Sequence, residues 1–459
     1  MSSPRTIPVE RDDRLEVDID GLGDGPDGIG RIGNYVIFVP GVLPGERAYV
    51  RITSAARKHG RGELLAVRKA APERVAARCP HFLACGGCHR QHQDYQAQLQ
   101  DKRERLQRAV AWALGDEAPT VAPPIAAEPP FGQRHKVVVH LRNTRDDRLE
   151  ACFHRLRSPE LVAVRECPAS QPRAWAIAMA AVALLHELPH GAWDPDFAPN
   201  DLLRSVLVRT TMTGQAHVVL VARQPSIPGL ERVLDDLHAA GATTISCNGN
   251  DGEFSRLLGP QTTVVSGPPR IEERLFGTKY LLSPDTFFQT SPEGAEHLVR
   301  LVNQWLAPTN QDDVADLYCG GGLLTLPLAR TARSALGVEL RTAAIRDADA
   351  SAQANGLRNV QWRSGHVESW LRACRRGQLP RPHLVAIDPP RTGLEPAVID
   401  ELRELRPRRI AYVSCEPRAL QRDLQALAAA GFRTRSVQPI DMFPQTCHVE
   451  AVACLERGS

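Results

Sequence analysis

The sequence lacks three features that would classify it at once: a long apolar run, a large excess of charge and an internal repeat. No segment is apolar over the length needed to cross a membrane as a helix, and residues 1–5 (Met-Ser-Ser-Pro-Arg) are not a secretory signal. We therefore expect a cytoplasmic protein. The net charge of +3 does not by itself indicate nucleic-acid binding. A chain of 459 residues exceeds the roughly 250–300 residues that one core usually supports, so several domains are expected.

The 11 cysteines include a cluster, Cys79, Cys85 and Cys88, with the spacing C-x5-C-x2-C. Because no secretory signal is present, a metal site is favoured over disulfides. Three thiolates need a fourth ligand. Cys167 is the favoured residue, and the alternatives are His81, His89 and His92. Ligation by cysteine fits either zinc or an iron–sulfur cluster, and the spacing alone does not choose between them.

Short alternating segments within residues 14–69 predict a small β-barrel. The expected strands are 15–19, 35–39, 45–52 and 62–67, and the glycine-rich segment 21–33 is expected to form turns. Residues 51–110 hold 13 Lys or Arg against 5 Asp or Glu, an excess that suits an RNA phosphate backbone. A solvated basic face with no ligand is the alternative.

A helix is expected over residues 91–114, followed by a linker rich in proline and alanine at 118–130. The region 131–285 mixes expected strands with expected helices and is predicted to be an α+β domain. Its strands are expected at 136–140, 205–209 and 217–221, and its helices near 172–188 and 229–240. Arg134, His135 and Lys136 lie before and at the start of the first strand, where they could contact phosphate or remain solvated.

The C-terminal region predicts a Rossmann-like α/β sheet, because polar segments follow buried strands in succession. A glycine turn follows the strand in 313–322, Glu339 ends the next strand, and Asp388 begins an Asp-Pro-Pro loop after a third. Ligands bind at the carboxyl ends of such parallel strands, and an acid at the second strand can hold a ribose. The sequence therefore predicts a nucleoside-cofactor site at this edge.

Cys415 and Glu450 are the two candidate reactive residues. Cys415 follows the apolar run 410–413, so its thiol is expected at the same edge of the sheet, although free cysteines are often simply buried. Glu450 lies within an otherwise apolar run, which predicts a raised pKa and suits a base. A solvated acid on an edge strand is the alternative.

Five motifs together resemble the RNA uracil-5-methyltransferase family over nearly the whole chain. They are 287–289 (Phe-Phe-Gln), 316–320 (Asp-Leu-Tyr-Cys-Gly), 388–391 (Asp-Pro-Pro-Arg), 414–417 (Ser-Cys-Glu-Pro) and 448–450 (His-Val-Glu). The resemblance implies a class I fold that binds S-adenosylmethionine through Gln289, Tyr318, Glu339 and Asp388. Many relatives carry asparagine where this chain has Leu323, so one contact to the cofactor is expected to be missing.

The same resemblance implies that Cys415 is the nucleophile and Glu450 the base. It also implies a [4Fe-4S] cluster held by Cys79, Cys85, Cys88 and Cys167. The expected domains are a TRAM-like OB barrel (8–70), the cysteine cluster with a linking helix (71–130), a central α+β domain (131–285) and the methyltransferase domain (286–459).

The expected activity is methylation of C5 of a uridine in RNA, with 23S ribosomal RNA favoured and the protein acting as a monomer. Transfer RNA is the alternative substrate. A non-catalytic RNA-binding protein that keeps the fold is the alternative from another class, but it would have little reason to retain both Cys415 and Glu450.

Overall fold

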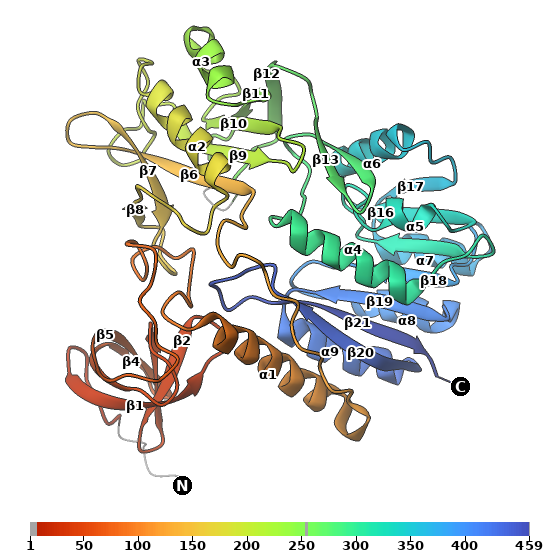
Figure 1. Cartoon of the computed structure of the whole chain (residues 1–459), viewed down its shortest axis with the longest axis horizontal. Coiled ribbons are helices and arrows are strands. Elements are labelled where there is room, and N and C mark those ends of the chain that lie inside the picture. Colours follow the sequence, from red (N-terminus) through yellow and green to blue (C-terminus); the bar gives the residue numbers. More distant parts are fainter. Residues whose placement is uncertain (1–6, 253–255, 459) are drawn as a thin grey trace. The chain divides into compact units, whose positions relative to one another are not determined.

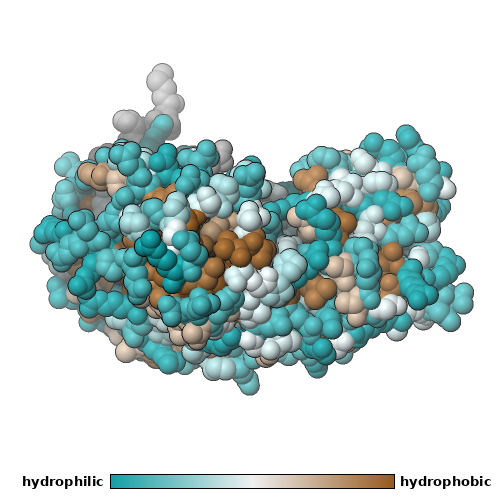
Figure 2. Space-filling view, turned by 90° about the horizontal axis from the view of Figure 1, so that it is seen from above, coloured by the Kyte–Doolittle hydropathy of each residue, from teal (hydrophilic) through white to brown (hydrophobic). Residues whose placement is uncertain are grey.

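The computed structural model describes residues 7–252 and 256–458. Contacts group the chain into two units (Figure 1). The first unit comprises residues 1–102, 153–162 and 445–447, and the second comprises residues 103–152, 163–444 and 448–459. No helix among the described residues is both long enough and apolar enough to cross a membrane. On the face drawn in Figure 2, hydrophilic residues predominate and hydrophobic residues form smaller patches between them.

The first unit contains a closed five-stranded barrel with the strand order β1-β2-β3-β5-β4. Its strands are β1 (Arg14–Leu22), β2 (Asp27–Ile32), β3 (Tyr35–Pro40), β4 (Arg47–Ala55) and β5 (His59–Lys69). Alternate residues point inward and form a core that includes Ile37, Val39 and Val50, none of them exposed. The expected N-terminal barrel is confirmed.

The expectation that residues 21–33 form only turns was wrong, because they include β2. This strand pairs with β1 on one side and β3 on the other. Two of its residues are glycines that lie against neighbouring side chains. A Cβ at Gly28 would come within 2.4 Å of Val42, and one at Gly30 within 2.3 Å of Val17. The glycines mark a close approach within a strand, a role for strand glycine distinct from a turn.

Many of the basic residues counted in 51–110 are paired within the first unit. Arg51 binds Glu63 at 2.5 Å, and Arg74 binds the buried Glu46 at 2.5 Å. Part of the local positive charge is therefore neutralised inside the barrel region. Exposed pairs such as Arg51–Glu63 add little stability, whereas Glu46 depends on its partner because its side chain is fully buried.

Helix α1 (Tyr95–Leu114) begins four residues later than expected. The carboxylate of Asp94 accepts hydrogen bonds from the backbone N–H groups of Gln96 and Ala97, so it caps the first turn. A cap of this kind ends the preceding loop at Asp94, which excludes residues 91–94 from the helix. The later turns of α1, from residue 103 on, belong to the second unit.

A seven-stranded mixed sheet forms the central α+β region, in the order β12-β11-β10-β9-β6-β7-β8. Its strands are β6 (Lys136–Asn143), β7 (Leu149–His154), β8 (Leu161–Ala163), β9 (Leu203–Thr210), β10 (Ala216–Ala222), β11 (Thr244–Gly249) and β12 (Gln261–Ser266). The helices are α2 (Pro172–Leu185), the short η2 (Leu230–Val233) and α3 (Leu234–Ala239). A turn at Thr213-Gly214 joins β9 to β10, with Gly214 at φ 82°.

A hairpin of β13 (Ile271–Leu275) and β14 (Thr278–Leu282) leads into the C-terminal sheet, whose order is β17-β16-β15-β18-β19-β21-β20. Strands β15 to β19 are parallel, and β21 runs antiparallel to both β19 and β20. The strands are β15 (Asp313–Leu317), β16 (Ser334–Glu339), β17 (Val360–Ser364), β18 (Leu384–Ile387), β19 (Arg409–Ser414), β20 (Phe432–Ile440) and β21 (Glu450–Arg457).

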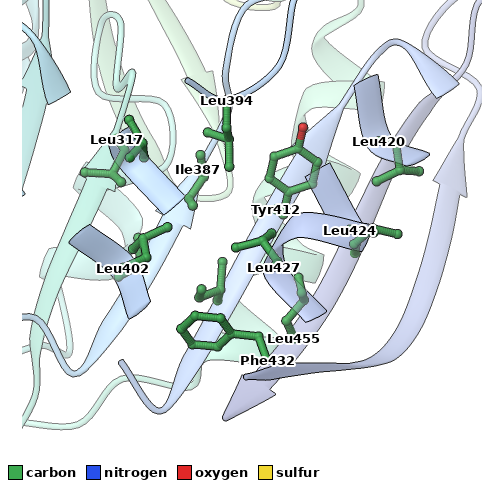
Figure 3. Close-up of a cluster of buried hydrophobic side chains, with 14 of the residues drawn as sticks. Leu317, Ile387, Leu394, Leu402, Tyr412, Leu420, Leu424, Leu427, Phe432 and Leu455 are labelled. Carbon is green, nitrogen blue, oxygen red and sulfur yellow. The ribbon is translucent and has the colours of Figure 1, made fainter. Parts of the chain in front are cut away.

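Helices cover both faces of this sheet (Figure 1), which confirms the predicted Rossmann-like architecture. Their bounds are α4 (Pro292–Leu306), α5 (Thr325–Ala329), α6 (Thr342–Ala354), α7 (Val367–Arg375), α8 (Pro396–Leu405) and α9 (Pro417–Ala429). Side chains of α4, α5 and α6 share one buried cluster, and those of α7, α8 and α9 share the other. Figure 3 shows the second cluster, where Leu420, Leu424 and Leu427 pack near Tyr412 of β19.

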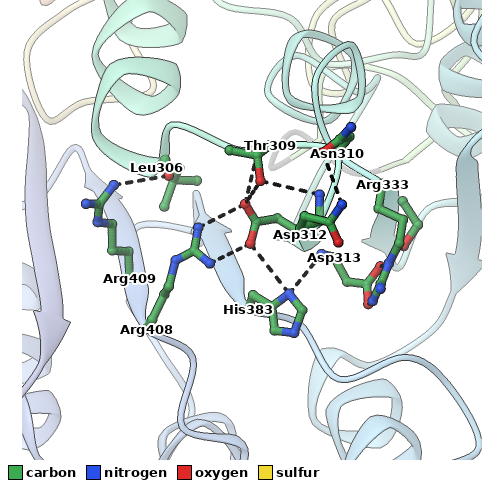
Figure 4. A network of polar contacts seen from close by, with 11 residues as sticks. Leu306, Thr309, Asn310, Asp312, Asp313, Arg333, His383, Arg408 and Arg409 are labelled. Carbon is green, nitrogen blue, oxygen red and sulfur yellow. Dashed lines mark hydrogen bonds and ion pairs between the residues drawn. The ribbon is translucent and has the colours of Figure 1, made fainter.

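A polar network connects the N-terminal ends of the parallel strands (Figure 4). Asp312, which is 1% exposed, accepts hydrogen bonds from Arg408 at 2.5 and 2.9 Å and from the Thr309 hydroxyl at 2.8 Å. Arg333 pairs with Asp313 beside it. These ion pairs fix the edge opposite to the one where β15, β18 and β19 end.

Candidate active site

The carboxyl ends of four parallel strands bring the predicted residues of the second unit to one edge of the sheet. Glu339 is the last residue of β16, and Tyr318, Asp388 and Cys415 come directly after β15, β18 and β19. Adjacent parallel strands that end together place these side chains above the same edge. Gln289 comes from a different segment, between β14 and α4.

The glycine turn after β15 is shaped by a run of positive φ angles: 64° at Tyr318, 53° at Gly320 and 85° at Gly322. Glycine tolerates this conformation and tyrosine rarely adopts it, so Tyr318 marks a locally constrained site. The Glu339 carboxylate accepts hydrogen bonds from the N–H of Gly320 at 3.2 Å and of Arg341 at 2.8 Å. The turn and the acid are thus held together, as a ribose-binding acid beside a glycine turn requires.

The segment that carries Gln289 lies against this turn. The Tyr280 hydroxyl donates to the carbonyl of Leu323 at 2.9 Å. The Thr286 methyl lies 3.1 Å from the position that a Cβ on Gly321 would take. Gln289 follows three residues later and is half-buried. Leu323 itself packs against the cluster that includes α4 and α5, so its side chain is part of the core.

Strand register brings Cys415 and Glu450 together. The ladder between β19 and β21 ends at the pair Ser414–Ala451, so Cys415 directly follows this pair and Glu450 directly precedes it, and the charge of Glu450 acts on the Cys415 thiol. Val413 and Val452, their neighbours two positions away, belong to the cluster beneath α4. Since side chains alternate along a strand, Glu450 points to that face, and Cys415 lies one residue beyond the end of β19.

Glu450 is 3% exposed, and its Oε1 has no hydrogen-bond partner among the described residues. Burial raises its pKa well above the usual range, and the charge of Asp388 adds to this while Arg391 opposes it. Burial raises the pKa of Asp388 to about 7. The site therefore holds carboxyl groups that can keep or release a proton near neutral pH.

The thiol of Cys415 is half-buried, and burial raises its pKa to about 11. The nearby Glu450 and Asp388 raise it further when ionised, while Arg391 lowers it. Two residues later, Pro417 begins α9, whose N-terminus favours negative charge nearby. Arg391 and this helix end are the features of the site that can stabilise a thiolate.

Asp316 is a site residue that the sequence reasoning did not assign. It is 1% exposed within β15, and burial raises its pKa to about 7, with Asp388 and Glu339 contributing. Its Oδ2 accepts from the Thr325 hydroxyl at 2.5 Å, and its Oδ1 has no partner among the described residues. The sequence does contain one indication of this residue, since Asp316 is an acid inside an apolar strand just before a glycine turn.

The cysteines fall into two groups by solvent exposure. Cys415 and the four predicted cluster ligands, Cys79, Cys85, Cys88 and Cys167, are partly exposed, and the other six cysteines are buried. In the first unit, the N–H of Gly87 points to the Cys85 sulfur at 3.3 Å, a contact that favours a thiolate ligand. Cys167 belongs to the second unit.

The alternative histidine ligands have other environments. His89 Nδ1 lies 3.3 Å from the sulfur of Cys447, within the first unit. His92 is 3% exposed and packs on the ring of Phe82 at 5.2 Å between centroids. Burial lowers the pKa of His92 to about 4, which keeps the ring neutral.

Comparison with known proteins gives the same picture for most of the chain. The tRNA (uracil-5-)-methyltransferase family model matches residues 265–458, and the TRAM domain model matches residues 8–65. An uncharacterized RNA methyltransferase of Halalkalibacterium halodurans is 33% identical over 99% of both chains. One from Gloeobacter violaceus is 34% identical over 97% of this chain and 96% of its own.

A solved structure is similar over the whole length. The crystal structure of Pyrococcus abyssi tRNA (uracil-54, C5)-methyltransferase in complex with S-adenosyl-L-homocysteine aligns with a TM-score of 0.76 and 26% identity. The alignment covers 96% of this chain and 99% of that one.

Proposed function

We propose that this chain, which belongs to the RNA uracil-5-methyltransferase family, methylates C5 of a uridine in RNA by way of a covalent bond between Cys415 and C6 of the base. It is an S-adenosylmethionine-dependent RNA methyltransferase; the covalent route and the roles of single residues are the proposal. The observation that carries the proposal is the strand register that places a buried glutamate, Glu450, beside the end of β19, where Cys415 follows and feels its charge.

Cys415 supplies the nucleophile. C5 of uracil is a poor nucleophile, but addition of the thiolate to C6 moves electron density through the ring to O4 and C5. Arg391 and the N-terminus of α9 favour the thiolate, whereas burial disfavours it. The thiol proton must therefore pass to solvent water, which reaches the half-buried Cys415, before the thiolate attacks C6.

Glu450 removes the proton from C5 after methylation. The C5–H electron pair then forms the C5–C6 double bond, the bond between C6 and sulfur breaks, and Cys415 regains its electron pair. The free Oε1 of Glu450 can accept this proton, and its raised pKa makes the protonated product stable in the site. The charge of Asp388 raises the pKa of Glu450, so one of the two acids is expected to be neutral, and Glu450 can act as the base only while Asp388 carries the proton.

Four residues are proposed to hold the cofactor: Gln289, Tyr318, Glu339 and Asp388. The carboxylate oxygens of Glu339 can accept hydrogen bonds from a ribose, and the glycine turn lets the cofactor approach the backbone beside it. When bound, S-adenosylmethionine supplies an electrophilic methyl group. The chain's own part is to orient that group toward the edge of the sheet where Cys415 lies.

The RNA substrate is proposed to be 23S ribosomal RNA, on the combination of the TRAM barrel with the cysteine cluster. Transfer RNA is the second candidate, because the solved relative from Pyrococcus abyssi is by its title a tRNA (uracil-54, C5)-methyltransferase. In either case the uracil must leave its stack to reach the half-buried Cys415. We further propose that the chain acts as a cytoplasmic monomer.

A [4Fe-4S] cluster is proposed on Cys79, Cys85, Cys88 and Cys167. The donor set fits, since four partly exposed thiols can all ionise to ligate iron. Its role is structural, because methyl transfer moves no electrons. Analysis of anaerobically purified protein for iron and sulfide tests it, and stoichiometric zinc without iron would refute it.

The reaction is tested with labelled S-adenosylmethionine and, separately, unmodified ribosomal and transfer RNA. Label in 5-methyluridine is expected from one of the two. Glu450→Gln should leave a Cys415–RNA adduct that survives denaturing electrophoresis, and the double variant with Cys415→Ala should form none. Cofactor binding without label or adduct would instead favour the non-catalytic RNA-binding protein.

A further inference from the structure

Three basic side chains meet beside the cofactor edge within the second unit: Lys136, Arg209 and Arg341. Lys136 of β6 pairs in register with Arg209 of β9, so the two side chains lie on the same face of the central sheet. Arg341, two residues beyond Glu339, is close enough for its charge to act on Lys136. Like charges in a cross-strand pair are destabilising, so this arrangement needs a compensating partner.

Arg209 already has its partners. Its guanidinium, in a residue only 6% exposed, donates to the carbonyls of Thr286 at 2.7 Å and Ser283 at 3.4 Å. The segment it binds is the one that leads to Gln289. Arg209 therefore joins the central sheet to the cofactor segment and adds a fixed positive charge behind Lys136.

Lys136 has no such partner. The ammonium group makes no hydrogen bond or ion pair with any residue in the described parts of the chain. Asp347, the acid whose charge acts most strongly on Arg209, is already bound by Arg270 at 2.6 Å and by the N–H of Ser283 at 2.7 Å. Burial, together with the charges of Arg209 and Arg341, lowers the pKa of Lys136 to about 8.

We propose that Lys136 and Arg341 bind a phosphate group of the RNA backbone next to the cofactor edge. The proposal rests on the proposed function only in taking RNA as the ligand. A half-buried ammonium close to two other cations is unfavourable unless an anion joins them, and lysine is a common phosphate ligand. The backbone of residue 135, just before Lys136, binds Thr290, so the site adjoins the segment that carries Gln289.

An RNA phosphate fits better than the carboxylate of the cofactor. Arg341 is exposed and lies at the start of α6, beyond the acid that is expected to hold the ribose. A ligand that reaches from the half-buried Lys136 to an exposed arginine extends to the surface, as a nucleic-acid backbone does. The N-terminus of α6 adds its partial positive charge there.

The test measures binding of unmodified ribosomal and transfer RNA transcripts to the full-length protein as a function of salt. A plot of log affinity against log salt has a negative slope. Lys136→Met should make this slope less steep by about 0.7, the value for one phosphate contact on single-stranded RNA. Affinity near 0.1 M salt should fall roughly tenfold. Arg341→Gln should do the same, and Lys136→Arg should keep the slope.

The matched control is Lys279→Met, which removes one positive charge from the same unit where Lys279 pairs with Glu272 at 3.2 Å. It should leave the slope unchanged. Lys136→Met should also raise the midpoint of thermal unfolding, because it removes a repulsive buried charge, so misfolding would not explain a loss of RNA affinity. If Lys136→Met fails to fold, Arg341→Gln and Lys136→Arg still decide the question.

An unchanged salt slope in both Lys136→Met and Arg341→Gln would overturn the proposal. Two such results are distinguished by the binding of S-adenosylhomocysteine, which is either unchanged or weakened. Weakened binding would assign the anion to the cofactor's carboxylate. Methyl transfer by the wild-type protein is measured separately. A reduced slope in the variants without methylation by the wild type would keep the phosphate site and reject the reaction.

Discussion

Asp423 joins the helix that follows the nucleophile to the loop that carries Asp388, and its removal should disturb both. The residue is fully buried in α9. Its Oδ2 accepts from the Tyr412 hydroxyl at 2.6 Å and from the N–H of Leu394 at 2.8 Å, and its Oδ1 binds Arg422 Nε at 2.8 Å. Tyr412 and Leu394 both belong to the cluster drawn in Figure 3.

The expected size of the effect follows from these contacts. In Asp423→Asn the carboxylate charge is lost, and the new NH2 group opposes a donor in either orientation: at the Oδ2 position it faces both the N–H of Leu394 and the hydroxyl of Tyr412, and at the Oδ1 position it faces Arg422. A buried hydrogen bond to a charged group contributes about 1.5–3 kcal/mol, so we expect a loss near 3 kcal/mol. Arg422 adds little, because its side chain is 56% exposed. Tyr412→Phe removes one bond and should cost about 1.5 kcal/mol.

Urea denaturation measures the stabilities, and Asp400→Asn is the matched control. Asp400 is 61% exposed and pairs with Arg403 at 2.7 Å, so this change should cost no more than about 0.5 kcal/mol. Turnover of Asp423→Asn, measured where it is folded, should fall by about 100-fold, since the loop carrying Asp388 and Arg391 shifts. An unfolding midpoint equal to that of Asp400→Asn would refute the reasoning.

Two further results are expected. Burial tends to raise the pKa of Asp312, but hydrogen bonds from Arg408 and Thr309 outweigh it and lower the pKa to about 2, against 3.8 when unfolded. This contribution, about 2 kcal/mol, is present above pH 3.8 and is lost as pH falls through 2, so Arg408→Met should flatten the acid limb of stability against pH. The raised pKa of Cys415, about 11, predicts slow alkylation at pH 7 that speeds up about tenfold per pH unit to pH 10. Arg391→Gln should slow it further at pH 8, as followed by mass spectrometry of the Cys415 peptide; an equal or faster rate would contradict the role given to Arg391.

The sequence was sufficient to predict the order of features along the catalytic sheet. Glycine turn, Glu339, the Asp-Pro-Pro loop and Cys415 each follow an apolar run, and buried parallel strands read as such runs. Each of these features is local in sequence, so its position at a strand end does not depend on distant contacts. This is why the fold class and the edge of the sheet could both be predicted.

Features that depend on distant contacts were missed or misplaced. Strand β2 contains glycines because the side chains of Val17 and Val42, far away in sequence, leave no room for a Cβ. The junction at Asp423 depends on which loop packs against α9, and the pairing of Lys136 with Arg209 depends on which strands lie side by side. Composition and periodicity carry no information about either.

The pairing of Cys415 with Glu450 is the clearest case of a property set by register. Strand β21 is inserted antiparallel between β19 and β20, so its first residue lies where β19 ends. A shift of one residue would turn Glu450 to the opposite face, away from Cys415, and would move Val452 out of its core cluster. The apolar residues of β21 therefore stabilise the register that the reaction needs, and a substitution such as Val452→Ser should impair turnover through the position of Glu450, although Val452 does not itself take part in the chemistry.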